Sequence, residues 1–260
     1  MNFSPDYLLH LADNALVLGQ RNAEWCGHGP VLEEDIALAN IGLDHIGQAR
    51  LLYQHVATQI GGDATEDTLA YFRNPEEFRN YVLLELPHRT AFAPSAAVER
   101  DYAVTIARNF LYSSLMILVW DALQNSTDTQ LAAIAAKSVK EVRYHLRHST
   151  DWMLRLGDGT AESHARMQAA LDYLMPYTQE FWATSAMETE AFAADVGVDI
   201  GALKERWQAS VDQVLAEATL TISSPKGHVT RGKDGIHSEH LSYLLAEMQS
   251  LARAHPEATW

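Results

Sequence analysis

The sequence predicts an all-α protein, a helical bundle with extra helices in a single domain. Apolar residues recur at intervals of three and four residues along most of the chain, which is the period of amphipathic helices. Turn signals rich in Gly, Pro, Asn and Asp separate these segments, and no alternating pattern of useful length indicates a strand. Long, regular helices favour packing as one bundle.

The predicted helices follow from their end signals. Ser4 is a good N-cap and Pro5 suits the first helical position, so the first helix begins there and ends before Gly27. Gly61–Gly62 ends the second helix, and Asn125–Asp128 supplies a turn and a cap between two later ones. The core helices are expected at about 5–25, 31–60, 96–124 and 128–156, and additional helices at about 160–183, 199–220 and 237–254.

The helix expected at 31–60 carries two apolar stripes and is predicted to be the central element of the fold. A helix that is apolar on two sides requires neighbours on two sides. The first stripe consists of Leu38, Ile41, His45, Ala49, Leu52 and Val56, and the second of Leu32, Ile36, Ala39, Leu43 and Ile46.

The segments between the long helices are less regular. Residues 63–86 are expected to form two short helices broken at Asn74–Pro75, and Pro176 is expected to kink the helix at 160–183. Residues 221–235 form the one long irregular segment, and this segment is locally basic in an acidic chain.

The composition excludes several classes of function. The chain of 260 residues has a formal net charge of −15, which argues against binding to nucleic acid or to an anionic membrane surface. Cys26 is the one cysteine, so an internal disulfide is excluded and a reducing, cytoplasmic location is expected. No basic region followed by an apolar run opens the sequence, and we expect neither a secretion signal nor a membrane span.

His45 and Gln48 lie three residues apart in the middle of the helix at 31–60, on or beside its first stripe. In ferritin-like di-iron bundles this location carries Glu-x-x-His, because residues at i and i+3 point to the same side and hold metals together with facing helices. Here the spacing is present but the carboxylate is not.

The other expected ligand positions also lack acids. On the helix at 128–156, His145 would need a Glu at the position of Val142, and valine cannot coordinate a metal. On the first helix Asp13 falls opposite the inward stripe, and the central inward residue of the fourth helix is Phe110. Burying carboxylates without a metal is costly, so Val and Phe are what a bundle without metals would carry. We therefore expect no metal, no bound cofactor and no catalytic residue in this chain.

Two histidine pairs have an alternative explanation. His237 and His240 have the spacing of a short metal pair, but without acidic or His partners in the sequence a structural or surface role is favoured. For His45 and His145, a hydrogen-bonded core histidine is favoured over a metal ligand.

Lys226, Arg231 and Lys233 make the segment 226–233 basic. Their charge suits the phosphates of a nucleotide-like cofactor. In a Gly-rich loop, however, solvated side chains are the favoured interpretation.

Three separated segments carry a resemblance to a known family. Residues 24–52, 135–149 and 235–249 resemble, in this order, the C subunits of the bacterial ring 1,2-phenylacetyl-CoA epoxidases, which are multicomponent oxygenases. The resemblance runs nearly end to end and includes the TIAR segment at Thr105–Arg108 and the closing Trp260.

This resemblance implies a ferritin-like fold and a non-catalytic, structural subunit. It implies pairing with a catalytic A subunit, itself ferritin-like, which carries the di-iron site and binds phenylacetyl-CoA, in a heterodimer and a higher assembly. The complex epoxidises the aromatic ring with oxygen, using electrons from a reductase subunit, in aerobic phenylacetate breakdown. Homodimerisation of the chain alone, and contact between loop 226–233 and coenzyme A, stay open.

A second hypothesis is a free-standing ferritin-like oxidase or oxygenase with an unorthodox metal site. Its ligands would come from His45, Gln48, Glu141 and His145. The number of inward carboxylates on the four core helices discriminates between the two hypotheses, because a di-iron site needs several. None is securely placed, which favours the structural subunit.

Overall fold

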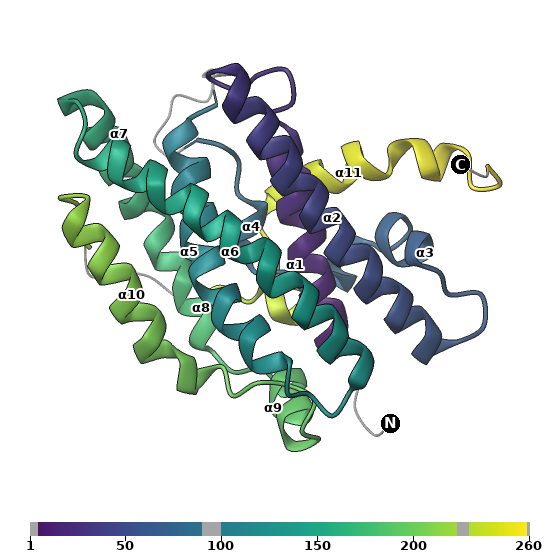
Figure 1. Ribbon diagram of the computed structural model, residues 1–260. Coiled ribbons are helices and arrows are strands. Elements are labelled where there is room, and N and C mark those ends of the chain that lie inside the picture. The colour runs from purple at the N-terminus through teal and green to yellow at the C-terminus, as the bar shows by residue number, and fades with distance from the viewer. Residues whose placement is uncertain (1–4, 90–99, 223–228, 259–260) are drawn as a thin grey trace. The chain divides into compact units, whose positions relative to one another are not determined.

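The computed structural model describes residues 5–89, 100–222 and 229–258. Within these ranges the chain is all-α and contains no strand; an isolated antiparallel bridge joins Arg231 and Ile236. The predicted all-α class is therefore confirmed. Figure 1 shows the helices in chain order, from α1 in purple to α11 in yellow.

The described residues form two compact units that alternate along the chain. The first unit takes its residues from 1–86, 185–197 and 230–260, and the second from 87–184 and 198–229. The prediction of a single domain stays a prediction. The first unit contains α1 (Asp6–Ala23), α2 (Leu32–Ile60), α3 (Glu66–Tyr71), η1 (Pro75–Glu77), α4 (Val82–Glu85), α9 (Ala186–Ala193), η4 (Gly232–Asp234) and α11 (Glu239–Ala254). The second contains α5 (Tyr102–Leu123), α6 (Thr129–Gly157), α7 (Ala161–Leu174), η2 (Met175–Thr178), α8 (Gln179–Trp182), η3 (Gly201–Leu203) and α10 (Lys204–Glu217).

In the first unit, α1 and α2 form a long helical hairpin (Figure 1). The helices approach closely at two glycines: a Cβ added to Gly19 would lie 3.2 Å from the carbonyl oxygen of Gly42, and one added to Gly42 would lie 3.3 Å from that of Gly19. Cys26 is exposed in the turn between the two helices. The remaining helices of the unit include α9, which packs on α1, and α11, which packs on α3 and α4.

The first apolar stripe of α2 is buried as predicted, from Leu38 to Val56. The prediction that the second stripe is also covered is wrong: Leu32 is 72% exposed, Leu43 65%, Ile36 52% and Ile46 39%. Apolar periodicity shows that a side of a helix avoids water, but it does not show whether the same chain provides the cover. The second stripe, Leu32, Ile36, Ala39, Leu43 and Ile46, is called the α2 face below.

In the second unit, α5 is the core helix and α6 packs along it, while α7 and α10 pack against both. The side chain of Asp128 caps α6 by accepting hydrogen bonds from the backbone N–H groups of Gln130 and Leu131, as the turn signal predicts. Among the described residues α5 is the one helix long and apolar enough to cross a membrane, but 89% of its apolar window is buried inside the fold. Such burial is typical of the core helix of a folded domain.

The helix boundaries correct several predictions. The helix expected at 96–124 begins at Tyr102, and residues 96–99 lie outside the described residues. The helix expected at 160–183 is interrupted at Pro176 by the 3-10 turn η2, because proline lacks the N–H that a continuous helix needs. The helix expected at 199–220 is shorter, with η3 followed by α10. The sequence interpretation missed α9, although the capping box of Ser185 and Glu188 signals its start.

Candidate functional site

The predicted ligand positions lie in both units and are all buried. His45 and Gln48 lie one turn apart on α2 in the first unit. Val142 and His145 lie one turn apart on α6, and Phe110 lies on α5, in the second unit. The side chains of valine and phenylalanine offer no atom that binds a metal. The assignment of these positions as degenerate stays a prediction.

The donor chemistry of the described residues does not fit a di-iron centre. Within residues 5–89, 100–222 and 229–258, no group of three or more His, Cys, Asp or Glu side chains is placed to hold a metal ion. A di-iron centre in a helical bundle needs carboxylates from several helices. The question is therefore what the buried acids of this chain do instead.

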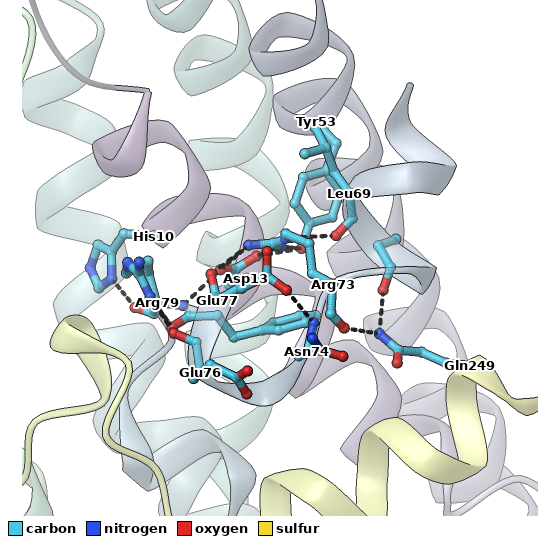
Figure 2. A network of polar contacts seen from close by, with 12 residues as sticks. His10, Asp13, Tyr53, Leu69, Arg73, Asn74, Glu76, Glu77, Arg79 and Gln249 are labelled. Carbon is cyan, nitrogen blue, oxygen red and sulfur yellow. Dashed lines mark hydrogen bonds and ion pairs between the residues drawn. The ribbon is translucent and has the colours of Figure 1, made fainter. Parts of the chain in front are cut away.

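Asp13 is the first of these acids, and its position contradicts the sequence prediction. The wheel of the first helix places it opposite the inward stripe, but Asp13 is fully buried, because almost every residue of α1 is buried. The Arg73 guanidinium forms an ion pair with its carboxylate, and the Tyr53 hydroxyl donates to it at 2.6 Å. The backbone N–H of Arg79 donates to its second oxygen at 2.8 Å. Figure 2 shows these donors converging on Asp13.

The pKa shifts in this network agree with a structural role for the Asp13 carboxylate, whose charge is balanced by hydrogen-bond donors and Arg73. Burial raises the pKa of Tyr53 well above its usual value, and the nearby Asp13 carboxylate raises it further. Burial acts to lower the pKa of Arg73, but Asp13, Tyr53 and Glu77 together raise it, so the Arg73 pKa lies above its usual value. Arg73 also donates to the carbonyls of Leu69 and Glu77. Through Arg73, Asp13 on α1 is therefore connected to α3 and η1. Asp13 is fully used by its protein partners.

His10 lies at the edge of the same network (Figure 2). Its Nδ1 lies 2.6 Å from the carbonyl oxygen of Arg79, and its ring packs edge-on against Tyr81. Burial lowers the pKa of His10, against the opposing effect of Glu188. Because a neutral ring can donate from Nδ1 to this carbonyl, His10 is a buried structural histidine.

Glu85 is the second buried acid of the first unit, and it explains His237. The Nδ1 atom of His237 lies 2.8 Å from the Glu85 carboxylate, and its Nε2 atom lies 3.0 Å from the carbonyl oxygen of Phe78. The backbone N–H of Ser238 and the Asn80 amide also donate to Glu85. Both ring nitrogens of His237 thus face acceptors, so this ring has no lone pair directed at a metal. The geometry supports the structural role favoured for His237, and the role of His240 stays a prediction.

Glu188 is the third buried acid, and it corrects the expectation for the basic loop. The ammonium group of Lys233 lies 2.7 Å from the Glu188 carboxylate, and both side chains are buried. A solvated Lys233, or one that meets phosphates, is therefore wrong, because this cation already neutralises a buried anion. Arg231 pairs with Asp234 on the surface at 2.9 Å, and Lys226 lies outside the described residues.

The first unit also contains an open groove of about 700 Å³ between α2, α3 and α11. At its edge Arg50 pairs with Glu66 at 3.4 Å. A hydrogen bond from Gln54 lowers the pKa of Glu66, so this carboxylate is ionised at neutral pH. The sequence analysis did not identify this groove. Its apolar lining includes Leu16, Ile46, Tyr53, Phe72, Met248 and Leu251.

Comparisons with known proteins agree with the resemblance seen in the sequence. The sequence pattern of the family described as "Phenylacetic acid catabolic protein" matches residues 4–260. The chain is also 42% identical, over 260 residues and the full length of both chains, to the C subunit of the 1,2-phenylacetyl-CoA epoxidase of Escherichia coli (strain K12).

Proposed function

Because the chain belongs to the phenylacetic acid catabolic protein family, we propose that it is the non-catalytic C subunit of a multicomponent 1,2-phenylacetyl-CoA epoxidase. In this role it pairs with the di-iron catalytic subunit and stabilises it during aerobic phenylacetate catabolism. The full-length similarity to the C subunit of such an epoxidase supports membership of the complex.

The contacts of the buried acids are the observation that supports a non-catalytic role. In the first unit Asp13 and Glu188 are each paired with a protein cation, and Glu85 lies against His237, Ser238 and Asn80, so protein groups contact all three carboxylates. The positions where ligands would be expected include Val142 and Phe110, which cannot bind one. These residues keep the chain folded and leave oxygen chemistry to the partner.

A structural subunit has a physical reason to exist. A catalytic bundle must bury carboxylates and leave access for a large thioester, and both features lower its stability. A related subunit in which protein groups contact the buried Asp13, Glu85 and Glu188 offers a rigid surface. Burial of that surface at the interface stabilises the partner by mass action. The other subunits of the complex, including the reductase, are the remaining proposed partners. The proposed location of the complex is the cytoplasm.

The alternative, a free-standing oxidase, needs Glu141 as a ligand beside His45, Gln48 and His145. Glu141 instead pairs with Lys137 one turn away on α6, at 2.5 Å. This ion pair weighs against the alternative.

Iron content and partner dependence test the proposal together. Purified chain is loaded with iron, washed with a mild chelator and analysed beside a His45→Ala, His145→Ala double variant. We expect almost no iron in either protein, no turnover of phenylacetyl-CoA by the chain alone, and a higher soluble yield and turnover of the catalytic subunit when the chain is added. About two irons per wild-type chain, lost in the double variant, would establish the oxidase instead.

A further inference from the structure

The α2 face is an apolar surface without cover from its own unit. Leu32, Leu43 and Ile36 are 72%, 65% and 52% exposed. The spacing of the face keeps all its side chains on one side of α2, over a length of about 20 Å at 1.5 Å per residue. Isolated exposed apolar residues are common on proteins, but a continuous row on one helix marks an interaction surface.

The α2 face continues into the groove between α2, α3 and α11. Ile46, its last member, lines the groove, and so do Phe72 and Leu251, which are 40% and 57% exposed. The apolar surface of the first unit therefore extends from the start of α2 to the C-terminal helix. A row and a groove that join are suited to a long partner element.

The position of Gly47 favours a helix as the partner element that packs on the α2 face. Gly19 and Gly42 are explained by the close approach of α1 and α2, but a Cβ added to Gly47 would meet nothing within 4 Å. Glycine inside a helix is less favourable than alanine, and no contact among the described residues explains Gly47. It is on the same side of α2 as Leu43, one turn further along. A glycine there allows the backbone of a second helix to approach closely.

The acidic residues around this surface favour a partner with basic residues over a second copy of the chain. Arg50 is a cation of the groove lining, but it is paired with Glu66. A second copy of the chain would bring like charges together, whereas a partner with Lys or Arg at its rim would neutralise them. The acids that flank the α2 face and the groove are Glu33, Asp35, Asp44, Glu66 and Asp67.

We propose that the α2 face and the adjoining groove receive an apolar helix of the catalytic subunit, crossing α2 at Gly47 and flanked by basic residues. The identity of this partner rests on the proposed function. The surface itself rests on the exposure of the α2 face, the position of Gly47 and the acidic rim.

Gly47→Ala gives a test in which folding and binding change in opposite directions. In the chain alone, alanine strengthens α2 and meets no neighbour, so we expect the melting temperature to rise by about 2–4 °C. In the complex, the added methyl group separates the crossing helices, so we expect the dissociation constant for the purified catalytic subunit to rise about tenfold. Calorimetry measures both quantities.

A second variant and a matched control complete the experiment. Leu43→Ser removes an exposed leucine of the α2 face and is expected to weaken binding about tenfold as well. Tyr243→Ser removes an aromatic ring that is 70% exposed on α11 but does not line the groove, and it should leave binding within about twofold of wild type.

The outcomes separate the two proposals. If wild-type chain does not bind the catalytic subunit, the proposed function fails. If it binds, but Gly47→Ala and Leu43→Ser bind equally well, the docking surface is refuted and the function stands. If these variants only convert a self-associated wild type to monomers, measured by sedimentation, the surface joins two copies of this chain and the proposal is overturned.

Discussion

At the scale of single residues, the first unit is held by buried charges that protein groups satisfy. Asp13 receives donors from Arg73, Tyr53 and Arg79, which belong to α2 and to the segment after α3. A buried ion pair adds little when compared with apolar packing, but removing one partner leaves an unpaired buried charge. The cost of losing one such partner is therefore much larger than the net contribution of the pair.

We predict that Asp13→Asn destabilises the chain by about 3–5 kcal/mol, because the Arg73 guanidinium keeps its charge in a buried site. Urea unfolding followed by circular dichroism measures this change. A double variant, Asp13→Leu with Arg73→Met, should recover part of the loss. Lys137→Ala, which breaks an exposed pair, should cost about 0.5 kcal/mol or less. Equal losses for Asp13→Asn and Lys137→Ala would contradict the assignment.

We predict that acid destabilises the chain partly through His10. Burial lowers the pKa of His10 in the folded state, so below the ordinary value of 6.5 the unfolded state binds more protons. The contribution of His10 to stability is present above pH 6.5 and is lost as the pH falls through the lower folded-state pKa.

Urea unfolding at pH 5.5 and 7.5 measures this effect. The difference in unfolding free energy between the two pH values should be smaller in His10→Gln than in wild type. Glu188, Lys233 and Asp13 also act on His10, so the exposed residue His255 provides the control. His255→Gln should behave as wild type, and an unchanged difference in His10→Gln would remove His10 as the cause.

At the scale of secondary structure elements, the spacing of apolar residues correctly predicted which side of α2 is buried. It did not predict that α1 is buried on nearly all sides, or that the α2 face is exposed. Asp13 was missed because α2, α4 and α9 all pack on α1, so a helix wheel with one buried side does not apply. Lys233 was missed because loop composition indicates solvation, whereas its partner Glu188 lies 45 residues away in the chain. Long-range pairs of this kind leave no local pattern in one sequence.

We predict that Gly19→Val destabilises the α1–α2 hairpin by about 1–3 kcal/mol, since the Cβ alone would lie 3.2 Å from the Gly42 oxygen and from the His45 Cβ. Thermal unfolding of the whole chain measures the loss. Gly47→Val is the matched control, because the same side chain meets open space there. If both variants lose the same stability, the close approach of the helices is not what requires Gly19.

At the scale of the whole molecule, the chain passes repeatedly between its two units, near residues 86, 184, 197 and 229. The segment with α9 belongs to the first unit, where Glu188 is anchored by Lys233, but the chain on both sides of it belongs to the second. Neither unit is therefore a continuous piece of the sequence. Ending the chain near residue 184 or 197 removes part of both units, whereas ending it near residue 229 removes only the part of the first unit that contains α11.

We predict that both units unfold in one cooperative transition. Trp120, Trp152, Trp182 and Trp207 lie in the second unit, so tryptophan fluorescence reports mainly on that unit. Asp13→Asn, a change in the first unit, should shift the fluorescence transition as much as the circular dichroism transition. A fluorescence midpoint that stays at the wild-type value would show two independently folding domains.

The exposed Cys26 has a practical consequence. It is the one cysteine of the chain and lies in the turn before α2, six residues before Leu32. The two Cα atoms are therefore at most about 20 Å apart, whatever the path of the turn. A maleimide dye attached to wild-type protein is confined to one position beside the start of the α2 face. Docking of the proposed catalytic partner can be followed by fluorescence anisotropy or quenching without introducing a cysteine or removing another one.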